Sequence, residues 1–562
     1  MENESINVVE LFSGIGSQVK ALKNLNLSVN TVATCEWDLH AIIAYDYIHN
    51  SEPVPLEIEK MTKVELLERL GGYTFSNSGK EALPEDNLRT YSEEVLRRLY
   101  TAIVRNNNYV DVNSLRGKDL DESIDILTYS FPCQDLSNVG AFHGYNKGIE
   151  KDSGSRSSLL WQVGRILSEM KKNRQTMPGF LVMENVPALL SKKHFKDFSS
   201  WISELRQLGY ISKYFQLNAL DFGLPQNRPR LLMISVYVGE DTELSEVVLD
   251  YFKQMNEEEV VDTYKATEFY HPYSIEELLR IDYSNQILYD EAIECTPNVT
   301  KSRRKIWDDN PKLLLDNNRV NPEESFIRTI TTKQDRNPNS GNLYFDTGIA
   351  GKSKFRYLTP RECLLFMGFT DKDYEVLRNN NLEFHKGDAI FARDKIIRLA
   401  GNSIPVKMLE GVFYQIVVLQ DILEEVKARR NDKESNDNSD AVEIIKHHMF
   451  AAGIRSRLGK EPYPVSADIV YPKYKTAIFI NSDFYHGHAA QYAGVAKAQQ
   501  YWNNKIENIS RCDELKYREA ERLGWQVIII WKNDLYGPES KELLNNIERR
   551  VKSNLKTVPD KA

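Results

Sequence analysis

A short apolar run that ends in a proline–cysteine turn constrains the fold of this chain more than any other stretch. Residues 124 to 130 are rich in apolar and β-branched side chains, and Phe131-Pro132-Cys133-Gln134 follows directly. Such a run is typical of a strand buried in a parallel sheet, so the turn should lie at the sheet's carboxyl edge, where α/β folds bind ligands. A thiol there can act as a nucleophile, and the fixed φ of Pro132 would aim it. The alternative for a lone cysteine is a small hydrophobic residue buried in the turn.

Length and composition predict a globular protein of more than one domain. A chain of 562 residues is too long for one hydrophobic core, so two or three domains are expected. No apolar run approaches the roughly 18 residues of a membrane span. The net charge of −9 argues against a protein that coats nucleic acid, although it permits a local basic groove. The cysteines have no paired spacing, which argues against a disulfide framework and against a zinc site of cysteine pairs: they are Cys35, Cys133, Cys295, Cys363 and Cys512.

Two strand–turn units near the N-terminus predict a nucleotide-like ligand. Residues 6 to 12 form the first expected strand, and the turn Ser13-Gly14-Ile15-Gly16-Ser17 then opens a helix. Glycines in this place let a ligand approach the backbone at a helix N-terminus. The next expected strand, residues 31 to 35, ends in Glu36-Trp37-Asp38, which offers a carboxylate to a ribose and an indole face to an adenine.

A third strand is expected at residues 109 to 112, where Asp111 could accept a hydrogen bond from an adenine amino group. It is separated from the second strand by an insertion of about residues 51 to 107. The part from 81 to 104 has helical periodicity and many charges. We therefore expect the insertion to be a solvated helical decoration.

Acidic and basic side chains follow the next two predicted elements. The strand at residues 180 to 183 ends in Glu184, on the same sheet edge as Cys133. A buried carboxyl group there could have a raised pKa and act as a general acid, whereas the alternative is a carboxylate that caps a helix. Arg228 and Arg230 add two guanidinium groups just before a further predicted strand.

The order of these motifs resembles that of the cytosine-5 DNA methyltransferase family, over about residues 6 to 425. The shared motifs are Phe-x-Gly-x-Gly from Phe12, Glu-Trp-Asp from Glu36, Asp-Val from Asp111, Phe-Pro-Cys-Gln from Phe131, Glu-Asn-Val from Glu184, Gln-Asn-Arg-Pro-Arg from Gln226 and Gly-Asn-Ser from Gly401. Several motifs in a fixed order are far more specific than any one of them. The resemblance implies an α/β fold of the S-adenosylmethionine-dependent methyltransferase type, with a doubly wound mixed sheet.

The resemblance also implies a role for individual residues. It implies an S-adenosyl-L-methionine pocket lined by Phe12, Gly14, Gly16, Glu36, Trp37, Asp111, Pro132, Asn402 and Ser403. It implies that Cys133 is the nucleophile, that Glu184 engages ring nitrogen 3 of cytosine and that Arg230 lies near the cytosine carbonyl, with Gln134 and Arg228 in support. Thiolate addition at carbon 6 with protonation at nitrogen 3 turns the ring into an enamine that can attack a methyl sulfonium. The base must first be flipped out of double-stranded DNA.

On the same resemblance the chain divides into a catalytic domain at residues 1–236, a target-recognition region at 237–345 and a return to the catalytic domain at 346–430. In the recognition region, Lys301-Ser302-Arg303-Arg304-Lys305 could grip phosphates or could be a solvated basic turn. The polar run at 431–440 predicts a linker to a C-terminal domain at 441–562.

The C-terminal domain has a carboxylate and two histidines in a suggestive order. Strands are expected at residues 468 to 471, 476 to 480 and 525 to 531, and Phe484-Tyr485-His486-Gly487-His488 follows the second of them. Asp468 and the histidines would suit a divalent metal and a general base for phosphodiester hydrolysis. The alternative is a structural histidine pair in a turn.

This region resembles very-short-patch repair endonucleases, which have an α/β restriction-endonuclease-like fold, over about residues 440 to 535. The resemblance implies Asp468 as a Mg2+ ligand and His486 as the catalytic histidine, and it implies three supporting residues: Glu443, His488 and Asp513. The chain departs from the family pattern at Ile480-Asn481, where a threonine–histidine pair is usual. Asp483 and Asn533 stand where zinc-binding cysteines are usual.

We therefore expect a bifunctional enzyme that methylates cytosine in a specific DNA sequence and carries a nuclease-like domain for restriction–modification. A domain that nicks thymine–guanine mismatches is one alternative, and a DNA-binding scaffold or methylation sensor with an inactive nuclease half is another. A transfer-RNA cytosine methyltransferase is a third, against which the long recognition region weighs. We expect a cytoplasmic protein with double-stranded DNA as its partner, associated with the prokaryotic nucleoid while it acts and without a membrane partner.

Overall fold

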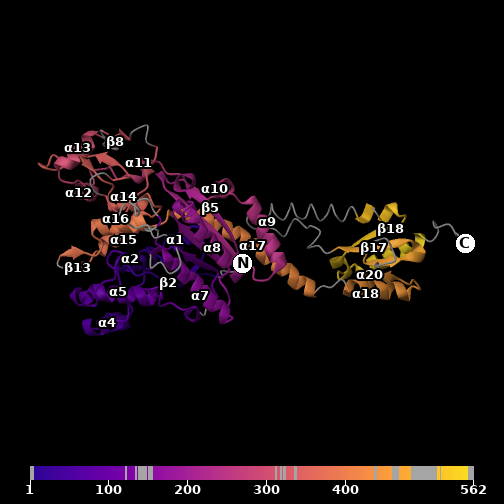
Figure 1. Cartoon of the computed structure of the whole chain (residues 1–562). Helices are drawn as coiled ribbons and strands as arrows, with labels where there is room; N and C mark the ends of the chain where they lie inside the picture. Colours follow the sequence, from indigo (N-terminus) through magenta and orange to yellow (C-terminus); the bar gives the residue numbers. More distant parts are fainter. Residues whose placement is uncertain are drawn as a thin grey trace. The chain divides into compact units, whose positions relative to one another are not determined.

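The computed structural model describes most of the 562 residues and forms two compact units, Met1–Ile416 and Val417–Ala562 (Figure 1). The described residues are 5–120, 123–132, 136, 149, 156–309, 313–316, 319–320, 325–334, 338–385, 387–435, 439–458, 467–481, 516–518 and 520–554. Each unit is described by itself.

The first unit is built on a six-stranded mixed sheet in the order β2-β1-β3-β4-β7-β5. The strands are β1 (Ile6–Leu11), β2 (Val29–Cys35), β3 (Ile126–Tyr129), β4 (Phe180–Asn185), β5 (Tyr210–Asn218) and β7 (Pro229–Tyr237). The first four strands pair in parallel, whereas β7 runs antiparallel to both β4 and β5. This arrangement confirms the predicted doubly wound mixed sheet. Because β2 lies on one side of β1 and β3 on the other, the strand order reverses at β1.

Helices cover both faces of this sheet, which explains why its inner strands β1, β3 and β4 consist mostly of buried residues. On one face, α7 (Leu160–Lys172) and α8 (Phe195–Leu208) pack on buried residues of β1, β3, β4 and β7. Trp201 of α8 donates a hydrogen bond from its indole Nε1 to the Tyr129 hydroxyl of β3, at 3.1 Å. On the other face, Tyr45 of α2 (Leu39–His49) donates to Glu10 of β1.

The insertion between β2 and β3 is helical, but it is not simply a solvated decoration. It contains α3 (Leu56–Glu59), α4 (Lys63–Leu70) and α5 (Glu93–Arg105). The apolar stripe of α5, which includes Leu96 and Leu99, is fully buried. Arg105 forms an ion pair of 2.8 Å with Asp46 of α2. The prediction is therefore wrong for α5, because this helix is amphipathic and buries one face against the catalytic unit.

The strand expected at residues 109 to 112 does not form. Only Asn108 makes an isolated bridge, to Thr34 at the end of β2. Val110 has a φ of 60°, a left-handed conformation that a strand cannot contain. The carboxylate of Asp111 accepts the backbone N–H of Asn113 at 2.9 Å, which turns the chain back.

The predicted recognition region contains helices and a small sheet. The helices are α9 (Thr242–Gln254), α10 (Glu257–Lys265), α11 (Ile275–Leu278), α12 (Gln286–Glu294) and α13 (Lys301–Asp309). The sheet has the order β12-β11-β8-β9, formed by β8 (Leu313–Asp316), β9 (Arg319–Val320), β11 (Asn342–Tyr344) and β12 (Phe355–Arg356), the last of which lies beyond the predicted end of the region at residue 345. Figure 1 shows α11, α12, α13 and β8 grouped together, away from α4 and α5. The basic run from Lys301 to Lys305 begins α13, so it is helical and not a turn.

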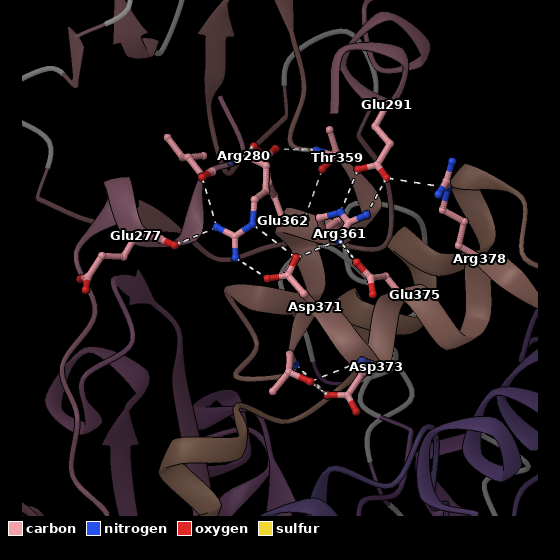
Figure 2. A network of polar contacts seen from close by, with 12 residues as sticks. Glu277, Arg280, Glu291, Thr359, Arg361, Glu362, Asp371, Asp373, Glu375 and Arg378 are labelled. Carbon is pink, nitrogen blue, oxygen red and sulfur yellow. Dashed lines mark hydrogen bonds and ion pairs between the residues drawn. The ribbon is translucent and has the colours of Figure 1, made fainter. Parts of the chain in front are cut away.

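Ion pairs anchor this region to α14 (Pro360–Leu365) and α15 (Asp371–Asn379). Arg361 donates to both carboxylate oxygens of Glu291, at 3.0 and 3.1 Å, and also to Asp371 at 2.9 Å (Figure 2). Arg280 donates to the same Asp371 at 2.6 Å. A network of this kind fixes α12 against the first turns of two helices.

The second unit contains a four-stranded sheet in the order β15-β16-β17-β18. Its strands are β15 (Arg457–Leu458), β16 (Ile469–Tyr471), β17 (Thr476–Asn481) and β18 (Gln526–Trp531), so the three strands predicted for this region are confirmed. The pairing of β17 with β18 is parallel and the other two pairings are antiparallel. Buried residues of α18 (Ser439–Ala451) and α20 (Ser540–Asn554) pack on one face of the sheet.

The polar run predicted as a linker is not irregular throughout. The helix α17 (Val406–Ser435) continues through its first five residues, and α18 begins at Ser439. Lysine and glutamate are good helix formers, and the run from Asn431 to Ser435 contains neither glycine nor proline, so polarity alone does not end the helix. In the part of the chain that the structure describes, no helix has the length and apolar character needed to cross a membrane.

Candidate active site

A cavity of about 330 Å³ opens beside the carboxyl ends of β1 and β3, where the strand order reverses. This is the position at which open α/β sheets bind their ligands. Its walls bring together segments that are far apart in the sequence. Of the residues that the sequence singled out, the lining includes Phe12, Gly14, Glu36, Trp37, Asp111, Pro132, Glu184, Arg228, Arg230, Asn402 and Ser403.

The two glycines after β1 have different roles. Gly14 has a φ of 56°, and no atom lies within 4 Å of the position that a Cβ would take, so its backbone faces open space. Gly16 does not line the cavity, contrary to the prediction. A Cβ on Gly16 would lie 2.3 Å from Nε2 of His49 on α2, so this glycine is required for helix packing.

Glu36 ties the turns after β1 and β2 together. Its carboxylate accepts the backbone N–H of Gly14 at 3.0 Å and those of Trp37 and Asp38 at 2.8 Å each. Burial, together with the charge of Asp38, raises the pKa of Glu36 to about 7, although these backbone hydrogen bonds oppose the shift. A carboxylate held in this way is oriented before any ligand arrives.

The turn that carries the predicted nucleophile is fixed from two sides. Cys133 and Gln134 lie outside the described residues, but the two residues before them are described. The Phe131 carbonyl accepts from Nδ2 of Asn185 at 3.0 Å, and the Pro132 carbonyl accepts from Oγ of Ser157 at 2.6 Å. Asn185 and Ser157 were not predicted as site residues, although a polar residue directly after Glu184 was a signal for the first of them.

Glu184 and Arg230 meet inside the cavity. Nε of Arg230 lies 2.9 Å from Oε1 of Glu184, and each side chain is 13% exposed. Burial raises the pKa of Glu184, while the positive charges of Arg230 and Arg228 oppose the rise. A buried carboxyl group with a raised pKa keeps its proton to a higher pH than an exposed one and can give it to a substrate.

Arg228 has a supporting role that differs from that of Arg230. It is 2% exposed, and it donates to three backbone carbonyls at 2.8 Å: those of Ile330, Gly401 and Ser403. Gly401 lies in the last turn of the helix α16 (Arg393–Asn402), and Ser403 follows that helix directly. Arg228 therefore holds the segments around the cavity in place. Asn402 and Ser403, predicted to close the pocket, both line it, and the Ser403 hydroxyl donates to the Leu399 carbonyl at 2.8 Å.

In the second unit the structure describes only part of the predicted nuclease site. Asp468 lies directly before β16, and its Oδ2 accepts the backbone N–H of Ile480 on β17 at 2.7 Å. Glu443 is on the exposed side of α18, where it pairs with Lys446 at 3.2 Å. His486, His488 and Asp513, like the aromatic pair Phe484-Tyr485, lie outside the described residues. Among the residues that are described, no three His, Cys, Asp or Glu side chains converge on a point that could hold a metal ion.

Two protein-family models match the chain, in two successive parts of the sequence. The model of the C-5 cytosine-specific DNA methylase family matches residues 90–418, and that of the DNA mismatch endonuclease Vsr matches residues 420–492.

Relatives of each part are also found. The chain is 30% identical over 419 residues to the orphan methyltransferase M.SssI of Spiroplasma monobiae, a match that covers 74% of this chain and 98% of the relative. It is 29% identical over 413 residues to the type II methyltransferase M2.ScrFI of Lactococcus lactis subsp. cremoris, covering 73% of this chain and 99% of the relative. It is also 31% identical over 111 residues to the type II nicking enzyme V.NmeAIP of Neisseria meningitidis, covering 19% of this chain and 79% of the relative.

The family match covers more than half of the chain, and the resemblance predicted from the motif order is thereby confirmed. The chain belongs to the C-5 cytosine-specific DNA methylase family and is a DNA cytosine-5 methyltransferase that continues into a Vsr-type endonuclease region.

Proposed function

We propose that the first unit binds S-adenosylmethionine and a flipped cytosine of double-stranded DNA side by side in the one cavity. Cys133, Glu184 and Arg230 then promote transfer of the methyl group to the cytosine. The reaction would take place on the prokaryotic nucleoid, in the cytoplasm. The observation that carries the proposal is the continuity of the lining: Glu36 and Trp37 line the same cavity as the Glu184–Arg230 pair.

The residues at one end of the cavity fit the cofactor. The open space beside Gly14 lets a ligand approach the backbone at the N-terminus of α1 (Ser17–Asn24). Glu36 offers a fixed carboxylate to the ribose hydroxyls, and the indole of Trp37 offers an apolar face to the adenine. When bound there, S-adenosylmethionine supplies an electrophilic methyl group.

The residues at the other end fit an activated cytosine. In the proposed mechanism the Cys133 thiolate forms a bond to carbon 6 while Glu184 gives its proton to ring nitrogen 3, so the electron pair of the ring moves to carbon 5. Arg230 orients Glu184 and offers its remaining N–H donors to the cytosine carbonyl oxygen. After carbon 5 has accepted the methyl group, its proton passes to water, the electron pair of that C–H bond expels the Cys133 thiolate and restores the aromatic ring, and ring nitrogen 3 returns its proton to Glu184.

Methyl transfer from labelled S-adenosylmethionine tests this function directly. Purified protein would be incubated with double-stranded DNA or with transfer RNA, and the product DNA would be sequenced after bisulfite treatment. We expect label only on DNA, at cytosines in one sequence context, and none with Cys133→Ala. Label on RNA, or equal methylation by the Cys133→Ala variant, would overturn the proposal.

For the second unit we propose a DNA endonuclease that serves restriction–modification together with the methyltransferase. The Vsr match and the type II nicking enzyme support a nuclease, and Asp468 is held by β17 where it could bind Mg2+. The departures at Ile480 and Asn481 favour a site preference of its own over thymine–guanine repair.

Four duplexes separate the possibilities: an unmethylated site, a methylated site, a thymine–guanine mismatch in the site and a scrambled control. Restriction requires that Mg2+-dependent cutting is confined to the unmethylated site, whereas repair requires a single nick in the mismatched duplex. Asp468→Asn, which keeps an acceptor for the Ile480 N–H, should abolish cleavage, while Asp534→Asn replaces an exposed carboxylate of the same unit and should not. Failure to cut any duplex would exclude the nuclease function.

A further inference from the structure

Two residues of the insertion between β2 and β3 line the proposed cofactor cavity. They are Thr74 and Gly79, which lie in the stretch that joins α4 to the helical turn at residues 85 to 90. Neither belongs to a motif that predicted the site. We call residues 74 to 81 the insertion turn.

The insertion turn is joined by its backbone to the segment that carries Trp37. The backbone N–H of Ser76 donates to the Trp37 carbonyl at 2.8 Å, and the N–H of Leu39 donates to the Ser76 carbonyl at 3.0 Å. Asp38 and Ser76 therefore form a parallel β-bridge. Ser76 is fully buried, so these bonds are shielded from water. The backbone around Trp37 is thus fixed by the insertion as well as by β2.

Further contacts hold the insertion turn in one conformation. The Ser76 hydroxyl donates to the Glu81 carbonyl at 2.6 Å, and this bond closes the turn. The backbone N–H of Leu83 donates to the Phe75 carbonyl at 2.7 Å, and Phe75 itself is 2% exposed. An element fixed in this way can bind a ligand without first losing much conformational entropy.

Gly79 completes a rim with residues from two other elements. It has a φ of 66°, and a Cβ there would lie 3.5 Å from Oδ2 of Asp38 and 3.8 Å from Nη1 of Arg398. Asp38 caps the N-terminus of α2, and Arg398 of α16 forms an ion pair with it. All three meet where α16 ends in the cavity residues Gly401 and Asn402.

We propose that the insertion turn is a cofactor-binding element, which encloses the adenosine half of S-adenosylmethionine and sets how tightly the cofactor and its demethylated product are held. The inference rests on the proposed cofactor site, and it gives the insertion a function in binding. The adenosine half is indicated because the insertion turn pairs with the segment of Trp37 and Asp38, which follows β2, whereas Glu184 lies on β4 and the strands β1 and β3 separate the two.

Substitution of Gly79 tests the rim. Asparagine tolerates a left-handed φ, so Gly79→Asn should fold while it places an amide beside Asp38 and the cavity. The matched control is Gly72→Asn, in the same insertion, where no atom lies within 4 Å of a Cβ and which does not line the cavity. We expect Gly79→Asn to raise the Kd for S-adenosylmethionine about tenfold, which corresponds to about 1.4 kcal/mol, and Gly72→Asn to leave it unchanged. The KM for DNA and the melting temperature should not move.

Ser76→Ala tests the closure of the turn, since it removes the bond to the Glu81 carbonyl and the bond that the hydroxyl accepts from the Ser78 N–H, but keeps both backbone bonds to the Trp37 segment. Loss of these two side-chain hydrogen bonds should weaken cofactor binding about fivefold, chiefly through faster dissociation. Calorimetry and stopped-flow release would be measured with S-adenosylmethionine, S-adenosylhomocysteine and 5′-methylthioadenosine, which lacks the amino acid.

Comparison of the three ligands shows which half of the cofactor the insertion turn contacts. Equal losses for all three in both variants would support an adenosine contact. Unchanged binding of 5′-methylthioadenosine beside weakened binding of the other two would overturn the assignment to the adenosine half. Equal affinities for wild type, Gly79→Asn and Ser76→Ala would overturn the inference alone, whereas a wild-type protein that binds none of the ligands would contradict the proposed function itself.

Discussion

Arg230 forms an ion pair with Glu184, with 2.9 Å between Nε and Oε1, inside the cavity. The ion pair and the burial of Glu184 shift the pKa of this carboxyl group in opposite directions. Burial disfavours the carboxylate and raises the pKa of Glu184, while the guanidinium favours the carboxylate and lowers it. Arg230 therefore lowers the pKa of the group that would give its proton to cytosine. Arg230 both orients the acid and limits how firmly the acid keeps its proton.

Removal of the Arg230 charge should shift the pH profile of methyl transfer. In Arg230→Gln the opposing charge is lost, so the pKa of Glu184 should rise further. Because the protonated acid is the active form in the proposed mechanism, the decline in rate at high pH should move to higher pH, even though the maximal rate falls. Profiles of kcat against pH would measure this, with Arg69→Gln on the exposed side of α4 as the control. A decline that stays in place or moves to lower pH would contradict the pairing.

The hydrogen bond from Asn185 to the turn before Cys133 should matter for the reaction but not for cofactor binding. Asn185→Ala removes the donor to the Phe131 carbonyl, two residues before Cys133. A misplaced nucleophile costs about a hundredfold in rate when the geometry shifts by roughly 1 Å. We expect a fall of that order in the formation of a covalent adduct with DNA that contains 5-fluorocytosine, and a Kd for S-adenosylmethionine within about twofold of wild type.

One result would count against this role of Asn185. Adduct formation at the wild-type rate would mean that the Phe131 carbonyl needs no donor. A Ser200→Ala variant, which changes a hydroxyl on the exposed surface of α8, provides the comparison for non-specific effects of substitution.

The anchoring of the predicted recognition region leads to a prediction about stability. Arg356 and Glu362 are fully buried and form two hydrogen bonds of 2.8 Å, and Glu362 also accepts the backbone N–H of Arg280. Arg356→Met leaves a buried carboxylate without its partner, which costs about 3–5 kcal/mol. Urea unfolding would measure the loss. The control is Arg89→Met, whose ion pair with Asp86 is almost fully exposed and should contribute less than about 1 kcal/mol.

The parts of the fold that the sequence predicted share one property. Each of β1, β2, β3 and β4 buries apolar residues and ends near a residue that lines the cavity: Gly14, Glu36 and Pro132 lie just beyond the first three strands, and Glu184 lies near the end of β4. The hydrophobic pattern places such strands in the sheet, and parallel pairing then brings their carboxyl ends together. β5 was not predicted, because buried and exposed residues mix along it as an edge strand of the sheet.

Residues that act through their backbone could not be predicted in this way. Ser76 joins the insertion to Trp37 by its N–H and carbonyl, groups that every residue except proline has. The two arginines show a related limit. Arg228 and Arg230 are two positions apart and identical in type, yet the first binds three carbonyls and the second faces Glu184. Both line the cavity, and residue type alone does not decide which one pairs with Glu184; the family resemblance placed Arg230 beside the cytosine and Arg228 in support.

Glu10 of β1 predicts that the stability of the first unit falls as the pH rises. It is fully buried, and burial raises its pKa to about 7, although the hydrogen bond from Tyr45 opposes this shift. In the unfolded chain the same group should titrate near 4.5, so between these values the folded state holds a proton that the unfolded state has lost. Raising the pH across this window therefore favours unfolding, and about 3 kcal/mol of stability is lost in total.

Glu10→Gln should remove this contribution while keeping an acceptor for Tyr45. Urea unfolding at several values between pH 5 and pH 8 should then give a shallower decline in the free energy of unfolding than wild type. Some decline should remain, because burial also raises the pKa values of Glu36 and Glu184. The variant Glu65→Gln, on the exposed side of α4, should decline as steeply as wild type. If Glu10→Gln and wild type lose stability in parallel across this range, Glu10 is ionised in the folded protein throughout, and its burial does not control the pH response.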